Sequence, residues 1–170
     1  MSYASVDPAT TPHITGEMLR RVAQIDLNYV PFPGGAPAVN ALLGGHVTAV
    51  MANLSEVMEH VAAGKLRPIV TTAGARLREM PEVPTLKESG FDLEGSAWFG
   101  FVAPPNTPKD VIDRLSVQFT DALKVPDVQA KLAAQGLYPS GLCGVQFAAH
   151  LRQQYESLGK IIREVNMKAQ

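Results

Sequence analysis

Apolar and polar residues follow one another along the first half of the chain in a pattern of short strands and helices. A helix is predicted to begin at Thr10 or Thr11, because either threonine can cap it and Pro12 suits its first turn. Its apolar positions, at helical spacing, are Ile14, Met18, Leu19 and Val22.

The stretch from residue 26 to residue 72 continues this alternation. Short β-branched and apolar runs predict strands at 26–30, 46–51 and 66–72, the first stopped by Pro31 and Pro33. Two helices are predicted between them. One starts at Gly35 or Ala36 and ends before Gly44, and the other starts after Asn53 or Ser55 and ends at Gly64. This β–α–β–α–β order with short connections predicts parallel strands joined by crossover helices.

The pattern changes after residue 72. A region rich in proline and glycine, 73–95, contains one short predicted helix at 85–88 and leads to a predicted strand, 97–103. The rest is predicted to be helical, in the segments 109–123, 126–135 and 145–166. A β/α half is thus followed by a mostly helical half, whose apolar faces need a partner to pack on.

Composition narrows the classes of function. The 170 residues are 46% hydrophobic and 18% charged, which is enough apolar material for a folded core. With 15 basic and 16 acidic side chains and no basic block, nothing indicates a nucleic-acid partner. The single cysteine excludes an internal disulfide and a cysteine-rich metal site. MSYASVDPATTPH has neither the basic start nor the apolar core of a signal peptide, so the chain as written is expected to stay in the cytosol.

The first candidate binding site is the loop that leaves the strand at Phe32 and enters a helix at Gly34, Gly35 and Ala36. A helix N-terminus presents free N–H groups and the positive end of a dipole, and glycines allow an anion to approach the backbone. The alternative is that the two glycines only shape a turn.

The second candidate is the start of the first helix. Ser5, Thr10 and Thr11 are small hydroxyl residues that can hydrogen-bond a carboxylate or phosphate beside free N–H groups. Asn53 offers a third such position after a strand. Helix capping is the alternative for all of them.

Catalytic and metal chemistry have weaker signals. His13 and Glu17 share a helix face, but no third metal ligand is evident. Ser5, His13 and Asp7 are a nominal triad without a nucleophile-elbow sequence. We therefore predict no catalytic residue, no metal and no cofactor.

Five motifs, in order, resemble those of the Bug (TctC-like) solute receptors of tripartite tricarboxylate transporters. They are VPFPGGAPAVNALLGGHV, HVAAGKLRPIVTT, MPEVPTLKESG, AWFGFVAPPNTPKDVIDRLS and VQAKLAAQGLYPSG. The resemblance implies an α/β fold like that of type II periplasmic binding proteins, whose two lobes close on a small carboxylate. Such receptors are nearly twice as long as this chain. It implies that residues 1–100 are the second lobe, with parallel or mixed sheet and flanking helices, and that 101–170 are a helical return segment of a first lobe that is absent.

The family frame Y-G-S-x-G-x-G-T-x-x-H is matched by Tyr3, Ser5, Thr10 and His13. Three of its glycines are replaced. The departures, including two further ones after the second predicted strand, are Ala4, Asp7, Ala9, Ala52 and Ser55. The resemblance implies a ligand site formed by Ser5, Thr10, Thr11, Phe32, Gly34, Gly35, Ala36 and Asn53.

The sequence and the resemblance together predict a solute-binding protein that is not an enzyme. The predicted partners are a small carboxylate, a membrane permease and, through the C-terminal helices, a second copy of the chain. The resemblance implies a periplasmic location. Two alternatives are a remnant that self-associates without binding a ligand, and a receptor-like sensor domain.

Overall fold

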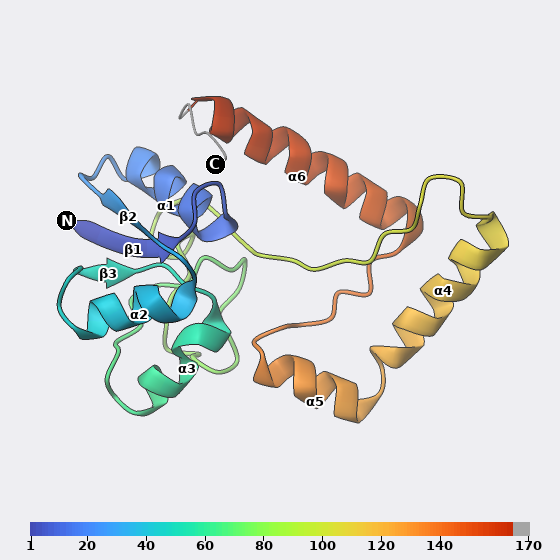
Figure 1. Ribbon diagram of the computed structural model, residues 1–170, viewed down its shortest axis with the longest axis horizontal. Coiled ribbons are helices and arrows are strands. Elements are labelled where there is room, and N and C mark those ends of the chain that lie inside the picture. Colours follow the sequence, from blue (N-terminus) through green and yellow to red (C-terminus); the bar gives the residue numbers. More distant parts are fainter. Residues whose placement is uncertain (165–170) are drawn as a thin grey trace. The chain divides into compact units, whose positions relative to one another are not determined.

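The computed structural model describes residues 1–164 and has an α/β fold built on a small parallel sheet (Figure 1). The strands are β1 (Ser2–Val6), β2 (Asn28–Phe32) and β3 (Ala49–Val50). Helices α1 (Thr11–Val22), α2 (Gly35–Leu43) and α3 (Leu54–Ala62) alternate with them. Three further helices follow: α4 (Lys109–Ala122), α5 (Pro126–Ala134) and α6 (Gly144–Glu164). The end predicted for the last helix, Asn166, lies outside the described residues.

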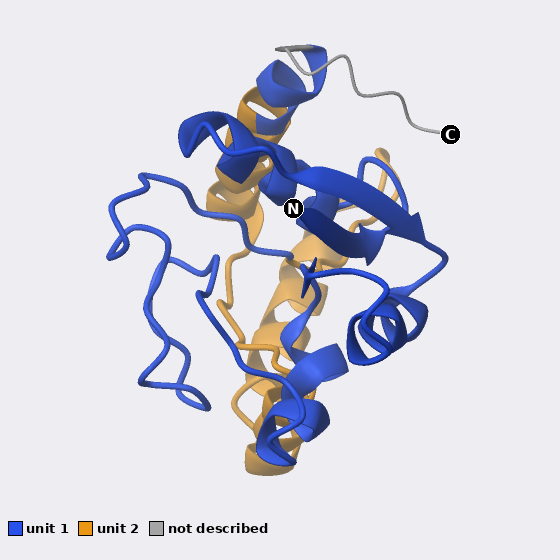
Figure 2. Ribbon diagram, turned by 90° about the vertical axis from the view of Figure 1, so that its left-hand side faces the viewer, with its two compact units in different colours: residues 1–97, 158–170 blue, residues 98–157 orange. Residues whose placement is uncertain are grey.

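The chain divides into two compact units (Figure 2). One comprises Met1–Ala97 with the end of α6 from Leu158, and the other comprises Trp98–Ser157. The first unit contains the sheet and the second contains α4, α5 and most of α6. The lobe boundary predicted at residue 100 stays a prediction.

The sheet has the order β2–β1–β3, and both outer strands run parallel to β1. The parallel strands predicted within 26–72 are confirmed for β2 and β3. The sequence pattern missed β1, although it is the central strand. The register pairs Tyr3 with Tyr29 and with Ala49.

Alternate side chains of β1 are buried on the two faces of the sheet. Ala4 belongs to a core cluster with Ala38 and Ala41 of α2 and with Val47. Tyr3, on the opposite face, lies against Gly16 of α1, where an added Cβ would clash with the tyrosine ring. A strand covered on both faces is typical of a parallel sheet, and this packing fixes α1 and α2 on opposite sides.

Three predicted elements differ from the structure. Residues 66–72 form no strand; their one bridge joins Thr71 to Thr85. Residues 97–103 have no assigned strand, so the strand predicted to carry Trp98 is wrong. Residues 85–88 form turns rather than a helix. The third difference has a local cause, because one turn with Thr85 and Glu88 capping each other is complete without further helical residues.

The sequence pattern predicted that Pro31 ends its strand, but in the structure it does not. It lies within β2, paired with Ser5 of β1. β2 is an edge strand, so one side of its backbone needs no donor to a neighbouring strand. Pro31 is therefore tolerated one residue before the strand ends.

Ala9 adopts a left-handed backbone conformation, with φ of 63°. This position corresponds to a glycine in the family frame, and an L-residue pays about 1–2 kcal/mol in this region. We expect Ala9→Gly to raise the free energy of unfolding by about 0.5–1 kcal/mol, measured by urea denaturation. The matched control is Ala23→Gly. Ala23 has a φ of −82°, so that variant should not gain stability. Equal effects of both substitutions would contradict the strain at Ala9.

Candidate functional site

The strand order places a topological switch point beside β1. The connection through α1 leads from β1 to β2 on one side, and the connection through α2 leads from β2 to β3 on the other. The strand order therefore reverses at β1, and the segments that follow the neighbouring strands β1 and β3 both start at the carboxyl edge of the sheet. In open α/β sheets the crevice at such a point is where ligands bind.

A cavity of about 50 Å³ lies at this point. Its walls come from the start of α1, from the segment between β3 and α3, and from three residues of the long connection that follows α3. The lining residues are Thr11, Pro12, Thr15, Met51, Ala52, Asn53, Thr72, Gly95 and Ala97. None of these residues carries a charge, and the volume suits one end of a small solute.

The N-terminus of α1 forms one wall. Thr10 is extended, with φ of −78° and ψ of 159°, and its side chain makes no capping hydrogen bond to the helix. Its hydroxyl instead donates to the Asp7 carbonyl at 2.8 Å. Pro12 has no N–H, so the first-turn donors of α1 that lack a partner within the helix are those of Thr11 and His13, at the positive end of the helix dipole. This wall can therefore bind an anion.

The N-terminus of α3 forms a second wall. Asn53 is its N-cap residue, and the Asn53 backbone N–H donates to Glu56 Oε2 at 2.8 Å. Ser5 supports this segment from β1, because its buried hydroxyl donates to the Met51 carbonyl at 3.0 Å. Two helix N-termini, one after each of two neighbouring strands, thus contribute to one cavity.

Thr15 and Thr72 also belong to the lining. Thr15 is 3% exposed and donates to the Thr11 carbonyl at 2.8 Å. Thr72 donates to the Gly95 carbonyl at 2.7 Å, and Gly95 N–H donates to the Thr72 carbonyl at 2.9 Å. Gly95 also packs against Thr15, since a Cβ there would clash with Thr15 Oγ1. Both threonine hydroxyls therefore lie next to Gly95.

The structure brings together only part of the predicted site. Thr11 and Asn53 line the cavity. Ser5 is buried in β1 behind the cavity, and Thr10 is the N-cap residue that precedes α1. The other predicted residues lie at the end of β2 and the start of α2, outside the lining: Phe32, Gly34, Gly35 and Ala36. The sequence analysis did not predict Thr15, Thr72 and Gly95 as site residues. The only signal for small polar residues there is in the VTT and EGS stretches.

The start of α2 faces a carboxylate of the chain itself. Gly34 has φ of 114°, which favours glycine. A Cβ added at Gly35 would clash with the Glu56 carboxylate. Glu56 therefore lies against the α2 N-terminus while it accepts from Asn53 N–H, so one acidic side chain ties the starts of α2 and α3 together.

The His13 side chain takes part in a backbone hydrogen bond and in ring packing. Its Nδ1 accepts from Ala9 N–H at 3.1 Å, and its ring stacks on Tyr29 at 3.8 Å. Burial lowers the pKa of His13, and Glu17 opposes that shift. The Ser5 hydroxyl donates to Met51 rather than to His13. Among residues 1–164 no cluster of His, Cys, Asp and Glu side chains is placed to hold a metal ion.

A polar network holds the segment that carries Thr72. Thr71 N–H donates to the Pro84 carbonyl at 2.9 Å, and Leu86 N–H donates to the Thr71 carbonyl at 3.0 Å. Thr85 lies between these contacts, and Glu88 Oε2 accepts from its N–H at 2.8 Å. The network therefore fixes the backbone next to the cavity.

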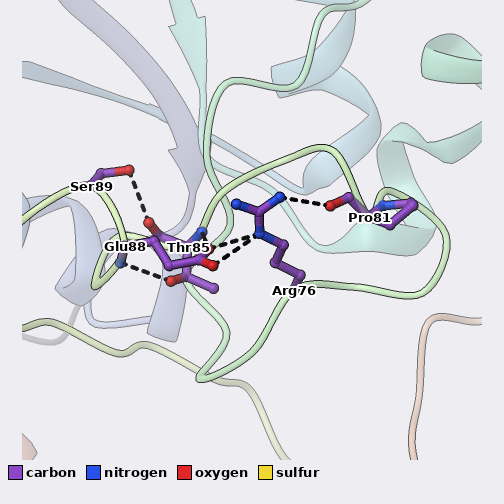
Figure 3. A network of polar contacts seen from close by, with 5 residues as sticks. All are labelled: Arg76, Pro81, Thr85, Glu88 and Ser89. Carbon is purple, nitrogen blue, oxygen red and sulfur yellow. Dashed lines mark hydrogen bonds and ion pairs between the residues drawn. The ribbon is translucent and has the colours of Figure 1, made fainter.

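Arg76 completes this network, as Figure 3 shows. Its Nε donates to both carboxylate oxygens of Glu88 at 3.0 Å, and its Nη1 donates to the Pro81 carbonyl at 3.0 Å. The Thr85 N–H and the Arg76 guanidinium hold the pKa of Glu88 below its usual value of 4.5.

We expect Glu88→Gln to lower stability most at neutral pH. A depressed carboxyl pKa contributes stability above the unfolded pKa, and this contribution is lost as pH falls through the folded value. The difference in urea midpoint between the unmodified chain and the variant should therefore shrink from about pH 7 to about pH 3. Glu59→Gln, on α3, controls for the loss of one negative charge. A difference that does not vary with pH would contradict this role of Glu88.

Comparison with known proteins places these features in a family. Residues 1–167 match the model of the tripartite tricarboxylate transporter family receptor. The protein BugT of Bordetella pertussis is 31% identical over 157 residues, which are 92% of this chain and 48% of BugT. The chain therefore spans about half the length of this curated relative.

Solved structures agree with the fold. A periplasmic transporter structure is 33% identical, with a TM-score of 0.82, and the match covers 98% of this chain and 56% of that one. MatC of Rhodopseudomonas palustris, solved with bound malate, is 25% identical, with a TM-score of 0.76 and coverage of 95% and 56%. No helix within residues 1–164 is long and apolar enough to cross a membrane. The chain belongs to the tripartite tricarboxylate transporter receptor (TctC, or Bug) family, a family of solute receptors.

Proposed function

We propose that this chain is the solute-binding lobe of a tripartite tricarboxylate-type transport system and binds a small carboxylate at the switch-point cavity. The observation that carries the proposal is the convergence of two helix N-termini on one uncharged cavity. Donor N–H groups and two dipole ends attract an anion. No lining residue is charged, and Glu56, which accepts from the Asn53 N–H, is the carboxylate with which an anion must compete at the start of α3.

Thr11 and Asn53 are the predicted site residues at the centre of this proposal. The first-turn N–H groups of α1 and α3 donate to the carboxylate, and Ser5 and Thr10 hold those helix starts in place. Phe32, Gly34, Gly35 and Ala36 form a second candidate anion position at the start of α2. Glu56 lies against that position, so an incoming anion must compete with a carboxylate already present.

The wider function also rests on the family. The MatC structure holds malate, and a malate-like dicarboxylate is the solute class that we propose for this chain. In the whole protein we expect the lobe to work in the periplasm and to deliver its solute to a membrane permease. Because the chain spans about half of its relatives, one half of the enclosing contacts is expected to be absent.

Isothermal titration calorimetry with a dicarboxylate and with its neutral diamide tests the proposal. This chain is expected to supply about half of the contacts that enclose a solute in its longer relatives. The dicarboxylate should therefore bind with a dissociation constant no better than about 0.1–1 mM. The diamide has nearly the same shape but no charge for the helix N-termini, so it should not bind measurably. Equal binding of both compounds, or binding of neither, would contradict the proposal.

A self-associating state is the second candidate, favoured by exposed apolar side chains of the second unit. The most exposed are Phe99, Phe101, Val102, Val145 and Tyr155, each between 78% and 87% exposed. Covering about 600 Å² of apolar surface per chain is worth on the order of 15 kcal/mol before the costs of association. We propose a homodimer through the C-terminal helices, which a remnant without ligand function would also form.

Sedimentation velocity at micromolar concentration tests the homodimer. We expect a dimer, and Val145→Ser with Tyr155→Ser should return it to monomer, because these two exposed apolar side chains lie on α6, in the second unit rather than in the unit that contains the sheet. A monomer with well-dispersed amide resonances from α4 to α6 would show that the helices pack within their own chain. A sensor domain would differ from both candidates in needing an attached effector segment.

A further inference from the structure

The turn that leads from β1 into α1 has a backbone donor that a side chain accepts. Asp7 and Thr10 close the turn, since the Thr10 N–H donates to the Asp7 carbonyl at 3.4 Å and Thr10 Oγ1 donates to the same oxygen at 2.8 Å. Pro8 occupies the second position and Ala9 the third, where a positive φ is typical of a type II turn. The Ala9 N–H donates to His13 Nδ1 at 3.1 Å. His13 therefore ties the strained residue of the turn to the first turn of α1.

The His13 ring is held so that its Nδ1 faces the turn. The side chain is 7% exposed, and its ring stacks on that of Tyr29 with 3.8 Å between centroids and 14° between planes. The Tyr29 hydroxyl is itself fixed, because it donates to the Val6 carbonyl at 2.7 Å. The Ala9 N–H needs a lone pair on Nδ1, so the ring is neutral and carries its hydrogen on Nε2. The contact therefore exists in only one of the two charge states of histidine.

The other titratable and charged groups around the ring come from α1, β2, β1 and the turn. They are Glu17, Arg20, Tyr29, Tyr3 and Asp7. Burial lowers the pKa of His13 from 6.5, and Glu17, which is paired with Arg20 at 2.9 Å, opposes that shift. Burial raises the pKa of both tyrosines, so they stay neutral. A protonated ring would also lie at the positive end of the α1 dipole. The ring is therefore neutral near pH 7 and gains its proton in the mildly acidic range.

We propose that His13 is a positioning residue for the solute: the neutral ring holds the turn 7–10 and the α1 end of the cavity in place, and protonation releases them. This inference rests on the proposed function, because it names what regulates the same cavity. A protonated Nδ1 is a donor that faces the Ala9 N–H across 3.1 Å, so the contact is lost. Ala9 then loses the bond that offsets its left-handed φ of 63°. The turn continues directly into Thr11, which lines the cavity, so its rearrangement changes the wall that receives the carboxylate.

The first step can be tested without a solute. Amide and imidazole resonances of the ¹⁵N-labelled chain are followed from about pH 7.5 to about pH 5. We expect the Ala9 amide to shift with the same midpoint as the His13 ring, below pH 6.5. His13→Asn offers Oδ1 as an acceptor that does not titrate, so its Ala9 amide should show no such midpoint. An Ala9 amide that does not follow the titration of His13 would overturn the proposal whether or not a solute binds.

Malate titrations at the two pH values test the second step. From about pH 7.5 to about pH 5 the affinity of the unmodified chain should fall at least about threefold more than that of His13→Asn. The protonation of malate itself is common to both and cancels in this comparison. His13→Phe keeps a ring on Tyr29 but removes the acceptor, so at neutral pH it should bind malate about two- to tenfold more weakly. His46→Asn, which replaces an exposed histidine, is the matched control and should behave like the unmodified chain.

The outcomes separate this role from carboxylate binding. If malate binds and its affinity varies with pH equally in the unmodified chain and in His13→Asn, the role of His13 is overturned while carboxylate binding stands. If malate binds at neither pH, the proposed function fails, and the role of His13 in binding fails with it.

Discussion

Gly16→Ala is expected to destabilise the sheet-containing unit by about 2 kcal/mol, although helix propensity alone predicts a gain of nearly 1 kcal/mol. Gly16 lies inside α1, and a Cβ there would clash with the hydroxyl end of Tyr3. Tyr3 is 2% exposed in the central strand, so its ring has little room to move. Overpacking a rigid core typically costs about 1–3 kcal/mol, which outweighs the propensity term. Urea denaturation measures the net effect.

Two further variants give this prediction its controls. Gly159→Ala in α6 meets only the end of the Arg163 side chain at 3.3 Å, so it should be neutral or stabilising. The Tyr3 hydroxyl is buried and has no hydrogen-bond partner within residues 1–164, so Tyr3→Phe should stabilise by about 1 kcal/mol and reduce the cost of Gly16→Ala. A stabilising Gly16→Ala, or additive effects in the double variant, would contradict the packing described here.

Thr11→Glu is expected to weaken carboxylate binding at least tenfold without loss of stability. Thr11 is the first residue of α1 and lines the cavity. A carboxylate in the first turn of a helix is favourable for the helix, by about 0.3–1 kcal/mol. The same charge repels the carboxylate of a solute, so folding and binding should respond in opposite directions. Calorimetry and thermal denaturation of the same sample provide both readouts.

Ala36→Glu is the matched control for charge and position. Ala36 is exposed in the first turn of α2, outside the cavity lining. The control variant adds the same charge to the same kind of helix end, and its dicarboxylate affinity should stay within about twofold of the unmodified chain. A loss of binding in Ala36→Glu, with Thr11→Glu unaffected, would place the solute at the start of α2 instead.

The helices of the first unit were predictable because their signals are local. Thr10, Pro12 and Asn53 mark helix starts, and α1, α2 and α3 begin within one residue of the predicted positions. Capping residues and glycine ends act on their own turn of helix and need no distant partner. The same holds for α4 and α5.

The strands were less predictable because a strand depends on its neighbours. β1 has the sequence SYASV, with three small residues that resemble a loop, yet both of its faces are buried. The segment 97–103 has the opposite character. Phe99 and Phe101 have high strand propensity but are about 80% exposed, with no strand beside them in the described chain.

The site was half predictable for the same reason. Thr11 and Asn53 start helices, and the rule that such ends bind anions needs only local sequence. Thr72 and Gly95 reach the cavity through a pair of hydrogen bonds that joins residues far apart in the sequence. No local pattern indicates which threonine of the pair Thr71 and Thr72 lines the cavity.

The location of the bound carboxylate is the most direct test of the central claim. Amide chemical shifts of the ¹⁵N-labelled chain, recorded during a malate titration to tens of millimolar, map that location. We expect the largest saturable shifts to cluster at Thr11, Thr15, Asn53, Thr72 and Gly95, which are among the residues that line the switch-point cavity. Largest shifts at Gly34, Gly35 and Ala36, or no saturable shift anywhere in the chain, would contradict it.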